Sequence, residues 1–276
     1  MSQRRKKFNL VFASNFKQEN SYLQEWIEYH LIVGVDHFYL YDQDGSEEAR
    51  ELLAPYEKEQ LVTRHQWTHL DGSRFDGPTR FYQVNKNHLA FTHCARTYRE
   101  YAQWMMKIDI DEFLYPPAGE DHLSTYLDTV DDGRVKGIHI PRFNYGYNNH
   151  ETQPSGLVIE SYTKREPDAS DHKDMANCGF LSNNRFCYSA HWWHYKFYKP
   201  GIYLRESDVN GIRINHYYTK SFEEYMQRQN VSRGRKRDRN TFNEKNRLSN
   251  DVEDQGMLRF TDAVRCGMKD RSKAGA

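Results

Sequence analysis

The stretch Trp104–Phe113, WMMKIDIDEF in one-letter code, is a short apolar run that ends in three carboxylates within four residues. An apolar run of this length is typical of a buried strand. Burying unpaired carboxylates costs free energy, so packing alone does not explain acids clustered where a strand ends. Such acids usually hold a cation, most often a divalent metal that in turn holds phosphate. We therefore expect a metal and phosphate site directly after this strand.

The sequence before this stretch alternates between strand and helix patterns. Helices are expected from Ser21 to Gly34, after Ser46, and from Pro78 to about residue 101. Ser21 opens a capping box, Ser46 is a capping residue, and proline is favoured in a first helical turn. Strands separated by helices imply parallel pairing and a doubly wound α/β sheet. The expected strands are residues 8–13, 37–41, 61–66 and 103–108.

Polar side chains follow three of these strands. Ser14 and Asn15 follow the first, Asp42 follows the second, and the acids of 109–112 follow the fourth. In open α/β sheets, ligands bind beyond the carboxyl ends of the strands. The three groups are therefore expected to converge on one site, where Asp42 accepts hydrogen bonds from a base or ribose. A turn role for Asp42 in Asp-Gln-Asp-Gly fits the sequence equally well.

The residues after Phe113 follow a different pattern. A short helix is expected at 122–130, a strand at 136–140 and a helix at 221–229, with an aromatic, strand-like region from 142 to 217 between them. The sequence has no internal repeat and no linker long enough to separate two independent domains. A single domain over residues 1–269 is therefore predicted, followed by a disordered tail at 270–276.

The composition narrows the class of protein. The 276 residues contain 39 Lys and Arg and 39 Asp and Glu, so no electrostatic attraction to nucleic acid is expected. No apolar stretch approaches the ~20 residues of a membrane span, and the first apolar run is too short for a signal peptide. A cytoplasmic protein without a membrane span is therefore expected. No P-loop or G-x-G-x-x-G motif is present.

Asp109 and Asp111 are the first metal candidates. If the strand continues through them, they share one face while Ile110 points into the sheet. Two oxygen ligands on one face suit Mg²⁺ or Mn²⁺ bridging a diphosphate. His216, directly after the alternating strand pattern of 212–215, could complete the protein ligands. Capping a turn or pairing with an arginine is the alternative for the acids, and a hydrogen-bonded structural role is the alternative for the histidine.

A basic segment at 228–239, with Lys220 before it, could close over the diphosphate. A solvated surface loop is the alternative for most of its residues.

Short motifs also run in order along nearly the whole chain. They are residues 15–20, 25–30, 34–38, 41–42, 109–113, 141–146, 216–217, 220–221, 223–225, 233–234 and 250–251. Together they resemble glycosyltransferase family 92, formerly a domain of unknown function, and the related family-2-like GT-A glycosyltransferases. Phe-Asn-Tyr-Gly at 143–146 departs from the Phe-Gly pair expected there, and the membrane anchor common in animal members is absent from this sequence.

The resemblance implies a Rossmann-like GT-A fold with a mixed central sheet, a nucleotide-binding half at 8–115 and an acceptor-binding half at 116–269. It also implies an inverting hexosyl- or pentosyltransferase that depends on Mn²⁺ or Mg²⁺. The donor would be a nucleotide-diphosphate sugar, with UDP-galactose as the first guess, and the acceptor a glycan hydroxyl. Carried onto this chain, Asp109 and Asp111 match the D-x-D motif, and His216 matches the metal-binding histidine. Asp42 matches the acid at the nucleoside, and Lys173 a basic residue facing the diphosphate.

An inverting transfer needs a carboxylate that removes the acceptor proton, and this base must differ from the metal-bound Asp111. Four carboxylates lie in the corresponding region, and Asp208 and Asp174 are preferred over Asp171 and Glu206. Two other classes of protein remain open at this point. One is a metal-dependent nuclease or phosphohydrolase, and the other is a non-catalytic domain that binds nucleotides or sugars.

Overall fold

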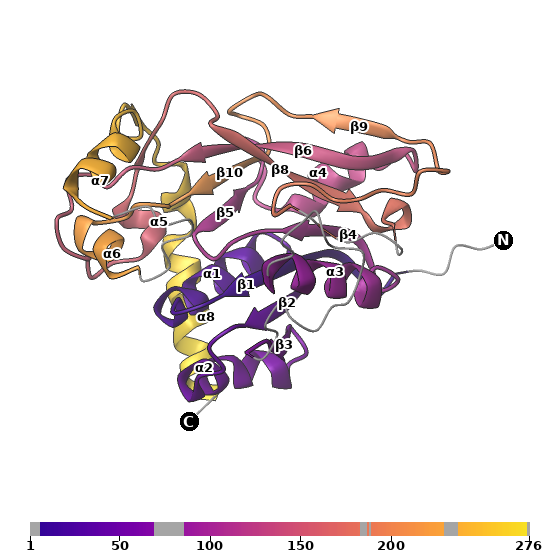
Figure 1. Ribbon diagram of the computed structural model, residues 1–276, viewed down its shortest axis with the longest axis horizontal. Coiled ribbons are helices and arrows are strands. Elements are labelled where there is room, and N and C mark those ends of the chain that lie inside the picture. The colour runs from indigo at the N-terminus through magenta and orange to yellow at the C-terminus, as the bar shows by residue number, and fades with distance from the viewer. Residues whose placement is uncertain (1–5, 69–85, 183–186, 188, 229–236, 275–276) are drawn as a thin grey trace, which may run out of the picture.

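The computed structural model describes residues 6–68, 86–182, 187, 189–228 and 237–274. Within these ranges the chain is a mixed α/β protein that forms one domain around a large curled sheet (Figure 1). The helices are α1 (Asn20–Ile32), α2 (Glu47–Lys58), α3 (Lys86–Tyr98), α4 (Leu123–Val130), α5 (Val158–Ser161), α6 (Phe222–Gln227), α7 (Arg239–Asn246) and α8 (Thr261–Ala274).

The described residues form nine strands of one sheet, in the order β3-β2-β1-β4-β8-β6-β10-β5, with β9 paired to β6. The strands β11 and β7 form a separate small pair. The strands are β1 (Phe8–Phe16), β2 (His37–Asp42), β3 (Val62–Gln66), β4 (Ala102–Lys107), β5 (Glu112–Tyr115), β6 (Val135–Asn144), β7 (Lys164–Arg165), β8 (Asp171–Asn177), β9 (Ile202–Arg205), β10 (Arg213–His216) and β11 (Val252–Glu253).

The first four strands of the sheet are parallel, as predicted from the alternation of strands and helices. Side chains alternate across them, because successive residues of a strand point to opposite faces. Phe12 and Met106 pack on the face that α1 and α2 cover, whereas Val11 and Met105 pack on the face that α3 covers. Both faces are therefore apolar, which is typical of a parallel sheet buried on both sides.

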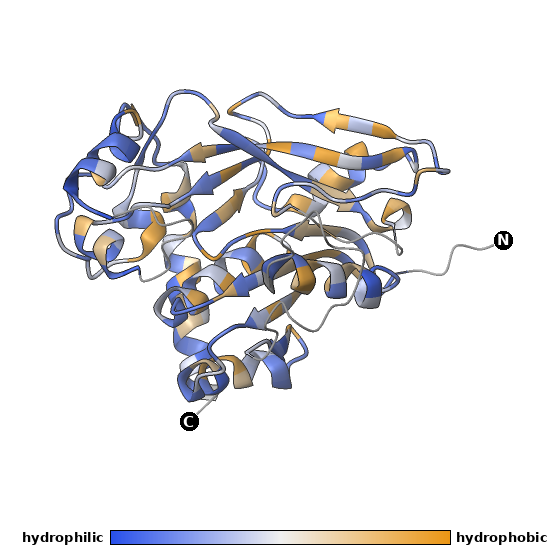
Figure 2. Ribbon diagram, in the orientation of Figure 1, coloured by the Kyte–Doolittle hydropathy of each residue, from blue (hydrophilic) through white to orange (hydrophobic). Residues whose placement is uncertain are grey.

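The second half of the sheet is mixed. β8 pairs antiparallel with both β4 and β6, β10 runs parallel to β6, and β5 runs antiparallel to β10. The prediction of a mixed sheet in a single domain is confirmed. The hydrophobic colour in Figure 2 falls mainly on the central strands, whereas the outer helix α7 is mainly hydrophilic.

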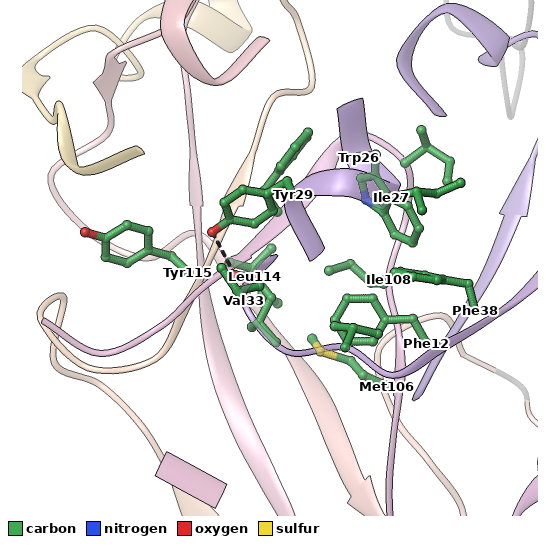
Figure 3. Packing of buried hydrophobic residues seen from close by; sticks show 14 of the residues in the cluster. Phe12, Trp26, Ile27, Tyr29, Val33, Phe38, Met106, Ile108, Leu114 and Tyr115 are labelled. Carbon is green, nitrogen blue, oxygen red and sulfur yellow. Dashed lines mark hydrogen bonds between the residues drawn. The ribbon is translucent and has the colours of Figure 1, made fainter. Parts of the chain in front are cut away.

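The hydrophobic core between α1 and the sheet extends to the end of β4. Figure 3 shows Trp26 of α1 near Phe12 and Phe38, and Tyr29 of α1 beside Leu114, to whose carbonyl oxygen its hydroxyl donates at 3.1 Å. Fully burying one such aromatic side chain contributes roughly 1.5–3 kcal/mol. The Trp26 indole N–H also donates to the Glu112 carbonyl oxygen at 2.8 Å. Helix α1 therefore anchors the residue that follows the two expected metal ligands.

Several helix ends differ from the sequence prediction. Ser46 caps α2 as predicted, since its hydroxyl accepts from the Ala49 N–H at 3.1 Å. Ser21 does not cap α1, because the helix already begins at Asn20. Helix α8 continues through the predicted disordered tail as far as Ala274, since Arg271 pairs with Glu28 of α1. The predicted helix start at Pro78 lies outside the described residues.

Candidate functional site

A cleft of about 660 Å³ opens at the carboxyl ends of β1, β2, β4 and β10. This is the edge of the sheet at which the sequence places its polar clusters. The lining is mostly polar, and both signs of charge face the same space. The charged residues that line it are Lys17, Glu19, Asp109, Asp111, Arg142, Glu224, Arg228 and Arg237.

Asp111 and His216 lie next to each other across two strands. Strand β10 pairs antiparallel with β5, which places His216 opposite Glu112, and the Tyr217 N–H donates to the Asp111 carbonyl oxygen at 2.8 Å. The His216 Nε2 and the Asp111 Oδ1 are 3.6 Å apart. Both side chains line the cleft. The backbone pairing thus brings together an oxygen and a nitrogen ligand that are separated by more than a hundred residues.

Asn144 sets the tautomer of His216. The Asn144 side-chain N–H donates to the Ser170 hydroxyl at 2.8 Å, so the amide oxygen is the atom that faces His216 Nδ1 at 2.7 Å. Nδ1 therefore donates, and Nε2 keeps its lone pair toward Asp111. Burial holds the pKa of His216 well below its ordinary value, despite the attraction of Asp111. A neutral imidazole whose other nitrogen donates to an amide oxygen is the form that binds metals.

Asp111 is an ionised carboxylate surrounded by cations. Burial alone would favour its neutral form, but the cations Arg228 and Lys220 outweigh burial and hold the pKa of Asp111 well below its ordinary value. The Arg228 guanidinium donates to Asp111 Oδ2 at 2.7 Å and to the Tyr218 carbonyl oxygen at 2.9 Å. Asp111 Oδ1, on the His216 side, is the oxygen that is turned away from Arg228.

Lys220 is a buried cation beside this group. Its ammonium lies 3.7 Å from the centre of the Tyr22 ring, and the described residues place no carboxylate within ion-pairing distance of it. Burial and the neighbouring Arg228 lower the pKa of Lys220 to about 8. An anion entering the cleft would stabilise the charged form of this lysine. Of the predicted basic segment, residues 229–236 lie outside the described part of the chain.

Asp109 has a different environment from Asp111. The Lys173 ammonium lies 2.7 Å from Asp109 Oδ2 and 2.5 Å from Glu112 Oε2, and Lys173 is 1 % exposed. Glu112 also accepts from the Asp109 N–H at 3.0 Å and from Arg142 at 3.1 Å. Strand β4 ends at Lys107, so the two aspartates sit in a turn rather than on a continuing strand. Lys173 therefore neutralises the Asp109 and Glu112 carboxylates, and it does not itself line the cleft.

The predicted donor-binding residues separate into two groups. Asn15 lines the cleft, and its side-chain Nδ2 is buried with no hydrogen-bond partner among the described residues. Ser14 instead donates to the Ile108 carbonyl oxygen at 2.5 Å, which holds the end of β4. Asp42 is fully buried, accepts from Arg64 at 2.8 Å and from the Gly45 N–H at 2.8 Å, and does not line the cleft. Asp42 thus has the turn environment that was the alternative reading.

The two preferred candidates for the base do not line the cleft. Asp174 is buried and accepts from His139 Nδ1 at 2.9 Å. Asp208 accepts from the Asn210 N–H in an exposed turn. Asp171, in contrast, lies 3.2 Å from Arg142 and 3.4 Å from His191, both of which line the cleft. The structure therefore places Asp171 beside two residues of the cleft lining, although none of the four carboxylates lines the cleft itself.

Several site residues were not singled out in the sequence, although they lie within the short motifs 15–20 and 141–146. Asn144 and Arg142 lie at the end of a strand predicted to stop at residue 140, so their approach to the cleft was not predicted. Glu19 lines the cleft before α1, where desolvation and the nearby Asp111 raise its pKa to about 7. The sequence marks Glu19 as one residue in a polar run. Only the strand register and the cleft distinguish these three residues from their neighbours.

The chemistry of the donor set fits a divalent metal held by two protein ligands. Asp111 Oδ1 and His216 Nε2 face each other with the protonation states that a metal requires. Within the described ranges, no group of three or more His, Cys, Asp and Glu side chains is placed to hold a metal. The remaining ligands would come from phosphate and water, as is common for Mg²⁺.

The fold and the cleft together define an α/β protein with a ligand site at the carboxyl ends of its parallel strands. The chain belongs to glycosyltransferase family 92, whose profile matches residues 11–255.

Several plant proteins are similar to this chain. A family 92 protein of Ricinus communis, RCOM_0530710, is 25% identical over 222 residues, which cover 77% of this chain and 35% of the relative. The family 92 protein Os08g0121900 of Oryza sativa subsp. japonica is 24% identical, covering 80% of this chain and 35% of that protein. The Arabidopsis thaliana galactan β-1,4-galactosyltransferase GALS2 is 33% identical over 121 residues, or 42% of this chain and 22% of that enzyme. The chain thus matches about a third of the length of the first two relatives.

None of the helices in the described part of the chain is long and apolar enough to cross a membrane.

Proposed function

We propose that this protein is an inverting glycosyltransferase that moves a sugar from a nucleotide-diphosphate donor to a glycan hydroxyl. The observation that carries the proposal is the pairing of Asp111 with a neutral His216 in a cleft at the carboxyl ends of the parallel strands. Family membership and relatives named galactosyltransferases support a transferase and make UDP-galactose the first donor to test. A GT-A fold agrees with the sheet order and its mixed second half.

The donor would lie with its diphosphate between Asp111 and the cations of the cleft. A Mn²⁺ or Mg²⁺ ion held by Asp111 and His216 would supply electrostatic stabilisation of the departing diphosphate. Arg228 lines the cleft and suits the phosphate oxygens, and the buried Lys220 beside it adds positive charge on the same side. The unpartnered Asn15 Nδ2 can donate a hydrogen bond to the nucleotide part of the donor.

Nucleotide binding tests this proposal most directly. We expect UDP to raise the midpoint of thermal unfolding by a few degrees when Mn²⁺ is present, because a ligand at 100 times its Kd adds about 2.7 kcal/mol to stability. Chelating the metal with EDTA should remove most of the shift. Asp208→Asn is a matched control, since this exposed aspartate lies outside the cleft and should keep the full shift. A shift equal with and without metal would contradict metal-assisted donor binding.

Hydrolysis of UDP-, GDP- and TDP-sugars in the presence of Mn²⁺ would then identify the donor. UDP-galactose is expected to be hydrolysed fastest. A nuclease or phosphohydrolase with two metals would need a second dense cluster of acidic and histidine ligands, and the described residues hold no such cluster. The transferase is therefore the better supported function. A purely binding domain would retain the thermal shift without any donor turnover.

We infer that Asp171 is the base that removes the acceptor proton. Four carboxylates were candidates for this role. Within the described part of the chain, only the Asp171 carboxylate of these four contacts residues that line the cleft, namely Arg142 and His191. Its side chain is 42 % exposed, so an acceptor hydroxyl can reach it. Glu206 instead accepts a hydrogen bond from Tyr126 at 2.5 Å.

Asp171→Asn should lower kcat for transfer about 10²–10⁴-fold, because general-base catalysis contributes that much. The UDP thermal shift should not change, since the substituted carboxylate does not face the donor site. Asp174→Asn, measured in parallel, should lower the free energy of unfolding but change kcat less than Asp171→Asn does. Wild-type kcat in Asp171→Asn would remove this residue from the mechanism.

A further inference from the structure

Trp192 is a half-exposed indole directly beside the cleft. It is 49 % exposed, and the preceding residue, His191, lines the cleft. Trp26, Trp104 and Trp193 are all buried. A single exposed aromatic side chain is common on protein surfaces and proves nothing by itself. Trp192 differs from an ordinary exposed aromatic residue because neighbouring residues fix both its ring and its backbone.

The indole is the outer ring of a three-ring stack. His139 of β6 stacks on His172 of β8 with ring centres 4.5 Å apart and planes 3° apart, and on Trp192 at 4.8 Å and 23°. His139 is fixed in turn by the buried Asp174, which accepts from its Nδ1 at 2.9 Å. Asp174 therefore orients the stack, which explains its burial away from the cleft.

The backbone of Trp192 is also fixed, by a buried cation. The Lys107 ammonium, 1 % exposed, donates to the Ser189 carbonyl oxygen at 2.8 Å and to the Trp192 carbonyl oxygen. The Trp192 N–H donates to the Ser189 hydroxyl at 3.3 Å. An aromatic ring held this firmly loses little conformational entropy when a ligand stacks on it, which favours binding.

We propose that Trp192 is the stacking platform for a pyranose ring of the acceptor glycan, beyond the sugar that is glycosylated. This inference rests on the proposed transferase function. The platform is continuous with the cleft through His191, and His172 adjoins the inferred base, Asp171. The indole stacks on His139, whereas Asp171 contacts the neighbouring His191, so the platform would contact a more distant sugar of an extended acceptor. The exposed Arg205, opposite His139 in the strand register, can donate to its hydroxyl groups.

An array of defined oligosaccharides, including β-1,4-linked galacto-oligosaccharides, tests the proposal on the full chain with UDP and Mn²⁺ present. We expect the wild type to bind at least one oligosaccharide, and Trp192→Ala to weaken that binding about tenfold, because a lost aromatic contact of about 1.4 kcal/mol corresponds to a factor of ten. Trp192→Phe should retain most of the affinity. Phe197→Ala, which removes a 95 % exposed ring outside the cleft lining, should bind like the wild type.

Acceptor length gives a second readout. Trp192→Ala should raise KM for long acceptors and leave KM for a monosaccharide acceptor unchanged. Three outcomes would overturn the platform. They are equal binding by the wild type and Trp192→Ala, a failure of the wild type to bind any oligosaccharide, and a changed oligomeric state in the variant. The UDP thermal shift on the same samples separates the two proposals. If oligosaccharide binding fails but the UDP shift is present, only the platform proposal fails. If the UDP shift is absent as well, the transferase proposal fails first.

Discussion

Asp111→Asn is expected to abolish metal-dependent donor binding while leaving the fold intact. The substitution keeps the shape of the side chain but removes the negative charge that faces His216 Nε2 and Arg228. A metal bound by two protein ligands loses half of them, so the Mn²⁺-dependent thermal shift with UDP should disappear. Transfer should fall by at least 10²-fold, the order expected when a transition-state charge loses its stabilisation.

The other two predicted ligands provide the comparison. His216→Gln should behave like Asp111→Asn, because the imidazole is the second half of the pair. Asp109→Asn should have a smaller effect on metal affinity, since its carboxylate is paired with Lys173. Circular dichroism should show that all three variants are folded. Full activity of Asp111→Asn would remove the metal assignment, and equal losses in all three variants would return Asp109 to the ligand set.

Lys173→Met is expected to be the most destabilising substitution near the site. The ammonium neutralises two carboxylates, one of which, Glu112, is 0 % exposed. Removing one partner of a buried ion pair costs about 3–5 kcal/mol, because it leaves a buried charge uncompensated. The free energy of unfolding, measured by urea denaturation, should fall by about that amount. Lys269→Met, which changes an exposed lysine, should leave the free energy of unfolding unchanged.

Two further measurements identify the cause of the loss. Lys173→Met combined with Glu112→Gln should recover part of the lost stability, since no buried carboxylate then remains at position 112. Burial already raises the pKa of Glu112 in the wild type, against the attraction of Lys173. Without the lysine that pKa rises further, so the variant should lose stability as the pH increases through it. A pH-independent loss would indicate a packing defect instead.

The sequence predicted the N-terminal half of the fold well, because its pattern is local. The parallel strands carry continuous apolar runs, and the helices between them begin at recognisable residues such as Ser46. Asp111 was also predictable, because packing alone does not explain acids clustered after an apolar strand. His216 was predicted chiefly from the family resemblance, since a structural role was the alternative. Their mutual placement agrees with the prediction of one site, whereas metal binding itself stays a prediction.

The polar residues of the second half could not be assigned from the sequence. Lys173 and Asp174 are neighbours in β8, and their opposite directions depend on the antiparallel register with β6. Lys173 reaches the turn of Asp109, whereas Asp174 reaches His139. The environment of Asp42 was hidden for a similar reason, since its partner Arg64 comes from the adjacent strand. A local sequence pattern does not reveal hydrogen-bond or ion-pair partners that other strands supply.

The position of β10 between β6 and β5 has a consequence for how the protein folds. His216 meets Asp111 only after β10 has inserted between two strands that precede it by many residues, and such long-range pairings are formed slowly. The segment 8–115 alone contains Asp111 but neither His216 nor Arg228. A nascent or partly folded chain therefore has an incomplete metal pair. Metal-dependent nucleotide binding should consequently be among the last properties gained during refolding.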